Sequence, residues 1–63
     1  MTEENDFEKI EKWVNEGISL QRESKHKEAI VYFDKAISLD ESMNGEADSN
    51  LLLLKNNSLT KIE

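Results

Sequence analysis

The stretches WVNEGISL, Trp13–Leu20, and AIVYFDKA, Ala29–Ala36, decide the fold of this chain. At helical spacing the first places a large, a small and a large residue on one face, and the second places a small, a large and a small one. These residues are Trp13, Gly17 and Leu20, then Ala29, Phe33 and Ala36. We therefore expect two closely approaching helices, because the small residues of each can receive the bulky residues of the other.

Three helices and no strand are expected. The chain has no Pro and two Gly, and its β-branched residues never alternate over four positions. The first helix should begin near Asn5, which can form a capping box with Glu8, and end around 23–24. The second should run from about 25–27 to 39–40 and the third from about 48 to 62. The polar stretch 40–46, with its Asn-Gly turn signal, should separate them.

The six motif residues together resemble a tetratricopeptide repeat. Residues 10–43 are similar to one full repeat, and residues 49–63 are similar to the first helix of a second, with Asn56 where the family has Gly. The resemblance implies one domain over 1–63. It also implies an all-α fold, in which an antiparallel helical hairpin and a third helix stack in the right-handed manner of the family.

The same resemblance implies a protein–protein interaction module, because such proteins generally bind a peptide or helix in the groove lined by the first helix of each repeat. Carried onto this chain, the partner-binding residues are Val14, Asn15, Ile18, Gln21, Arg22, Leu53 and Asn57, with Glu11 beside them. Some members hold a carboxylate with Lys and Asn where this chain has Val14 and Ile18, so that activity is not expected. In the alternative interpretation, Val14 and Ile18 serve packing alone.

Two other interpretations compete with the binding module. The run Leu51–Leu54 covers every side of a helical turn, which favours a self-assembly unit, a homo-oligomer with no foreign ligand. The Glu-Ala-Ile-x-Tyr-Phe texture of 28–33 also resembles the three-helix microtubule-interacting-and-transport family, which needs neither Trp13 nor Gly17.

Catalysis has few candidate residues, and we expect no enzyme. His26 is the one histidine and falls in a predicted turn near Ser24. A nucleophile–base pair or a metal cluster needs more than this. The chain has no cysteine and no glycine-rich phosphate loop, so we expect neither metal nor cofactor.

The charge balance argues against nucleic acid as a partner. The net charge is −6, which repels phosphate backbones. The basic cluster Arg22, Lys25, His26 and Lys27 is interpreted as cations at a helix carboxyl end, with a phosphate-binding patch as the alternative. No apolar run approaches the roughly 18 residues of a membrane span, and the acidic start lacks the layout of a secretory signal. We expect a cytoplasmic protein without a membrane partner.

Overall fold

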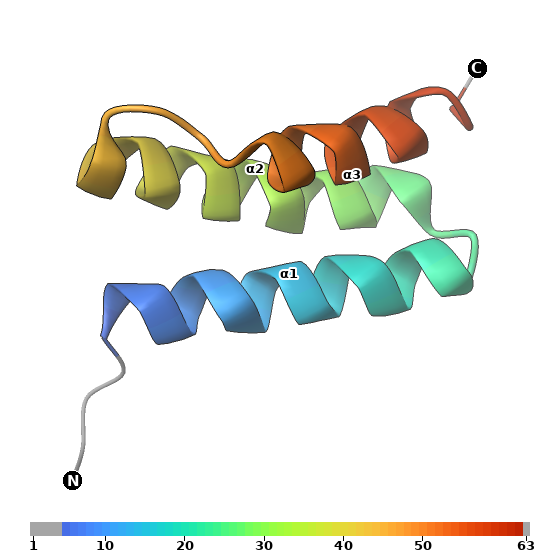
Figure 1. The fold of residues 1–63 in the computed structure, drawn as a ribbon. Coiled ribbons are helices and arrows are strands. Elements are labelled where there is room, and N and C mark those ends of the chain that lie inside the picture. The colour runs from blue at the N-terminus through green and yellow to red at the C-terminus, as the bar shows by residue number, and fades with distance from the viewer. Residues whose placement is uncertain (1–4, 63) are drawn as a thin grey trace, which may run out of the picture.

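The computed structural model describes residues 5–62, which form three helices and contain no strand (Figure 1). They are α1 (Asp6–Arg22), α2 (His26–Asn44) and α3 (Ser49–Leu59). α1 and α2 form an antiparallel hairpin. α3 runs antiparallel to α2, so α1 and α3 point in the same direction. The all-α hairpin plus a third helix is thereby confirmed. Residues 1–4 and 63 lie outside the described residues.

α1 begins and ends close to the expected positions. The backbone N–H of Glu8 donates to Asn5 Oδ1 at 2.8 Å, which is the predicted cap. The Glu8 carboxylate accepts from the side-chain amide of Asn5 at 3.3 Å. At the other end Ser24 has a φ of 64°, and the N–H of Lys25 donates to the carbonyl of Leu20 at 2.8 Å. These bonds turn the chain sharply into α2.

α2 continues to Asn44, beyond the predicted end at 39–40. The stretch is polar, but it holds no helix breaker before Gly45, and the side-chain amide of Asn44 donates to Asp40 Oδ1 at 2.6 Å one turn back. The helix ends where Gly45 adopts a φ of 84°, a left-handed conformation suited to glycine. α3 ends at Leu59, three residues before its predicted end.

The contact between α1 and α2 depends on Gly17. A Cβ atom built on this glycine would lie 2.5 Å from Cε1 of Phe33, whose side chain is fully buried. Ala29 and Ala36, which flank Phe33 on the same face of α2, are fully buried as well. The expected close approach of small and bulky residues is confirmed.

α3 completes a thin core. Leu51 joins Ala36 and Ile37 in the buried cluster, and Trp13 packs against that cluster while remaining partly exposed. The indole of Trp13 is only partly buried, because three short helices form too thin a core to enclose so large a ring. An ion pair of 2.6 Å between Lys55 Nζ and Asp34 Oδ1 joins α3 to α2.

Candidate functional site: a groove between α1 and α3

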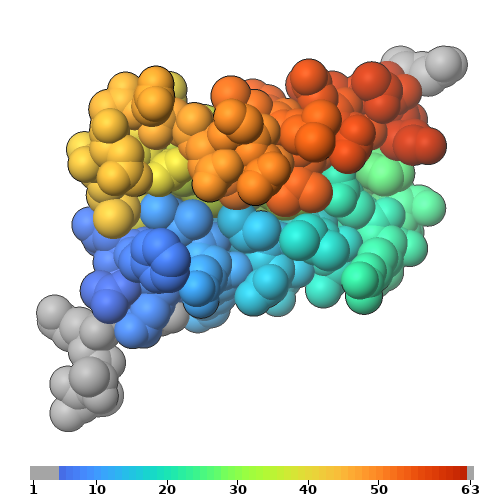
Figure 2. Space-filling view, viewed as in Figure 1, coloured from blue at the N-terminus to red at the C-terminus, as the bar shows by residue number. Residues whose placement is uncertain are grey.

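A groove of about 700 Å³ lies where α1 and α3 begin and α2 ends. Figure 2 views the face on which α1, in blue to teal, and α3, in orange to red, lie side by side. The apolar lining consists of Phe7, Ile10, Val14, Met43, Leu51 and Leu54. The polar lining consists of Glu11, Asn15, Asp40, Asn44, Asp48 and Asn50. All three helices contribute to both kinds of surface.

The apolar lining grades from buried to exposed. Leu51 is 6% exposed, whereas Phe7 is 63% exposed and Met43 44% exposed. Ile10 and Val14 are partly buried and pack against the core cluster. The core therefore forms one side of the groove, and large apolar side chains remain in water at its edge.

The charge of the lining is of one sign. Glu11, Asp40 and Asp48 contribute carboxylates, and no Lys, Arg or His within residues 5–62 belongs to the lining. The Asp40 carboxylate is held in place, because Oδ1 accepts from Asn44 and Oδ2 accepts from the backbone N–H of Asp48 at 2.7 Å. Asp48 caps α3 by accepting from the N–H of Asn50 at 2.8 Å. Two of the three carboxylates are thus fixed by the fold.

The residues predicted on α1 divide into two groups. Val14 and Asn15 line the groove, as does Glu11. Ile18 is partly buried outside it, and Arg22 is exposed at the end of the helix. Gln21 joins the helices, because its Nε2 donates to the carbonyl of Leu54 at 2.9 Å and to Ser58 Oγ at 2.7 Å.

On α3 the groove is lined by different residues from those predicted. Leu53 and Asn57 are exposed and lie outside the lining, which takes Asn50, Leu51 and Leu54 instead. The resemblance of residues 49–63 to the first helix of a second repeat did not fix the rotation of α3 about its axis. A better signal is the spacing of Leu51, Leu54 and Ser58, which places these three residues on one face of a helix.

The groove residues Phe7 and Met43 were not predicted. Phe7 continues the α1 stripe of Ile10 and Val14 by one turn, so the helical period could have indicated it. Met43 lies in the stretch expected to be a linker. It reaches the groove because α2 extends through that stretch.

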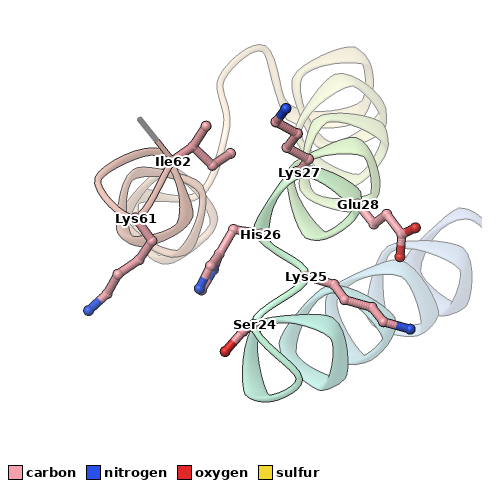
Figure 3. Close-up of a pocket in the computed structure, with 7 residues that line it drawn as sticks. All are labelled: Ser24, Lys25, His26, Lys27, Glu28, Lys61 and Ile62. Carbon is pink, nitrogen blue, oxygen red and sulfur yellow. The ribbon is translucent and has the colours of Figure 1, made fainter.

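A second hollow, of about 420 Å³, lies at the turn between α1 and α2. Figure 3 shows that its three lysines, Lys25, Lys27 and Lys61, point away from one another. Lys25 pairs with Glu23 at 3.4 Å. These lysines therefore do not converge on a common point, which argues against a phosphate-binding patch. The expected place at a helix carboxyl end holds for Arg22, in the last turn of α1, but not for His26 and Lys27, which begin α2.

His26 faces Ser58 rather than Ser24, its near neighbour in the sequence. His26 Nδ1 lies 3.3 Å from Ser58 Oγ, which also accepts from Gln21. Ser58 is fully buried, so a substrate could not reach its hydroxyl. This polar cluster joins the three helices and satisfies its own hydrogen bonds.

No family model matches the chain, and neither does any curated protein or solved structure. The tetratricopeptide resemblance thus stays a prediction that depends on the motif residues. None of the helices within residues 5–62 is long and apolar enough to cross a membrane. The same described range contains no group of three or more His, Cys, Asp or Glu residues that could hold a metal ion.

Proposed function

We propose that the chain is a cytoplasmic protein–protein interaction module, similar to a tetratricopeptide repeat, that binds a peptide or helix of a partner protein. The observation that carries the proposal is the groove between α1 and α3, with Phe7 and Met43 exposed at its edge. Its volume lies in the range of roughly 300–1,000 Å³ usual for ligand sites. Exposed apolar surface next to a concave lining is typical of interaction sites.

The packing of the helices supports the repeat-like assignment. Gly17 lets the Phe33 ring approach α1, and Ala29 and Ala36 are fully buried on α2. α1 and α3 run in the same direction and both pack against α2, so their faces can form a shared binding surface (Figure 1). The roles of Val14 and Asn15 as contact residues belong to this proposal.

The test is a peptide selection followed by a comparison of two variants. Peptides are selected from a displayed library against the whole chain, and their Kd is measured by fluorescence anisotropy. Phe7→Ser removes an exposed groove residue, and Val31→Ser removes a similarly exposed residue of α2 outside the groove. Losing the burial of a Phe side chain costs about 1.5–3 kcal/mol, so Phe7→Ser should weaken binding by roughly 10- to 100-fold.

Val31→Ser should leave the Kd unchanged. Equal effects of the two variants, or a library that yields no binder, would contradict the groove as the binding site. Circular dichroism of both variants shows whether they remain folded, which is expected because both side chains lie mainly in water.

A second candidate function is self-association through the outer face of α3. Leu52, Leu53 and Leu59 are exposed there at 48%, 59% and 45%, while Leu51 belongs to the core. Lys55 is the one charged residue within 49–59, and it is paired with Asp34. Like-charge repulsion between copies would therefore be weak at this face in spite of the net charge of −6.

Sedimentation velocity over a wide concentration range separates the two functions. A homo-oligomer would show a mass that rises with concentration in the wild type and stays monomeric in Leu53→Glu. A wild type that remains monomeric at every concentration would exclude the self-assembly unit and leave the binding module.

A further inference from the structure

We infer that the partner in the groove is a cationic amphipathic helix, with an apolar face flanked by Lys or Arg. This inference rests on the proposed function, since it specifies the chemistry of the ligand for the same groove. It is carried by three features of the described residues: the sign of the lining charge, the end of α2, and the arrangement of the exposed apolar side chains.

The lining charge selects for cations. Among the residues that the structure describes, three carboxylates and no basic side chain line the groove. Asp40 and Asp48 are already held by hydrogen bonds of 2.6–2.8 Å, so binding a cation requires little further ordering of these two side chains. Glu11 adds an exposed carboxylate from α1. An acidic or neutral partner would leave this charge unmatched.

The end of α2 adds to the negative potential. Its last turn contains no basic residue, and Asp40 and Glu41 lie near the end where helix carbonyls carry partial negative charge. α1 and α3 begin at the same end of the molecule, but acids already match their partial positive charge. These acids are Asp6 and Glu8 for α1 and Asp48 for α3. Asp40 and Glu11 therefore remain to be neutralised by a ligand.

The apolar side chains favour a helical ligand. Phe7 and Val14 lie seven residues apart on one face of α1, and Met43 and Leu54 contribute from α2 and α3. A strip of this kind accepts side chains that recur every three or four residues, as in other helix-in-groove complexes. Met43 can adapt its shape to different apolar partners. Lys or Arg beside the apolar face of the ligand would then meet Glu11 and Asp40 at the edge.

The test modifies one peptide from the display selection at its flanking positions. The best groove binder is remade with Lys, Gln or Glu at those positions, and its apolar residues are kept. Kd values are measured by anisotropy at low and high NaCl. We expect the order Lys, then Gln, then Glu from tightest to weakest, and a smaller spread at high salt, because salt screens exposed charges.

Two substitutions on α1 localise the effect. Glu11→Gln removes a carboxylate from the groove, and Glu16→Gln removes one from the same helix outside the groove lining. Glu11→Gln should weaken the Lys peptide by roughly two- to fivefold, the size of one exposed ion pair, and should leave the Gln peptide unchanged. Glu16→Gln should change neither.

The outcomes separate the inference from the function on which it rests. If all three peptides bind equally, or the Glu peptide binds best, while Phe7→Ser still weakens binding, the groove binds peptides but the cationic preference is wrong. If Glu11→Gln and Glu16→Gln weaken binding of the Lys peptide equally, the preference comes from the net charge of the protein. The inference that the peptide's cations bind at the groove is then wrong. If no peptide depends on Phe7, the proposed function itself fails.

Discussion

Replacing Gly17 by alanine tests the close approach of α1 and α2. The added Cβ would lie 2.5, 2.8 and 2.9 Å from Cε1, Cζ and Cδ1 of Phe33. Carbon atoms in contact prefer separations of roughly 3.5–4.0 Å, so the ring or the helix has to move by about 1 Å. Phe33 is fully buried, so its ring has no open space to enter.

Two effects of opposite sign determine how much Gly17→Ala changes the free energy of unfolding. Alanine favours the helix by about 1 kcal/mol over glycine. Overpacking a core costs about 1–3 kcal/mol, and the short distances place this site in the upper part of that range. We expect a net loss of about 1–2 kcal/mol, which would lower the Tm of a domain of this size by roughly 5–15 °C.

The assay is thermal and urea unfolding followed by circular dichroism. Ser19→Ala, at an exposed position of α1, is the matched control. It improves helix propensity with no contact to Phe33, so its Tm should rise slightly. Phe33→Leu in the Gly17→Ala background should cost less than in the wild type, because the smaller side chain relieves the clash. A Gly17→Ala protein that melts at or above the wild type would refute the reasoning.

Three further substitutions probe other parts of the fold. Trp13→Ala should cost about 2–4 kcal/mol, somewhat below a fully buried Trp, and abolish cooperative melting; an unchanged melting curve would contradict its contact with the core cluster. Gly45→Ala should cost about 1 kcal/mol in urea unfolding, because its φ of 84° strains a side chain although the surrounding space is open, and no change would mean that the turn relaxes. Ser58→Ala should cost about 1–2 kcal/mol by removing the acceptor of Gln21, whereas exposed Ser38→Ala should not destabilise; equal unfolding midpoints for the two would argue against the polar cluster.

The hairpin was predictable because its signals are local. Gly17 and Phe33 each belong to a set of apolar and small residues that recur at helical spacing. The few residues between the two predicted helices leave room only for a short turn. The end of α2 was mispredicted because the stretch 40–46 is polar, and polarity alone does not end a helix. The bond from Asn44 to Asp40 and the left-handed Gly45 set the boundary.

Only the α1 side of the candidate groove was predictable. Val14 and Asn15, which the tetratricopeptide resemblance implies as contact residues, line the groove. Gln21 was predicted as a ligand contact, but the structure uses its amide for Leu54 and Ser58. A sequence indicates that an amide is polar, yet it does not show which partner the fold brings within reach.

The sequence by itself determined the helical content, the hairpin and the excess of negative charge, because helix period, capping and composition act over a few residues. The tertiary structure alone decided how α3 rotates about its axis, which leucines it buries and where the acidic groove opens. Four consecutive leucines place an apolar side chain on every face of the helix, so the sequence does not indicate which of them is buried. Packing against α2, the Lys55–Asp34 ion pair and the hydrogen bonds of Gln21 fix the rotation of α3.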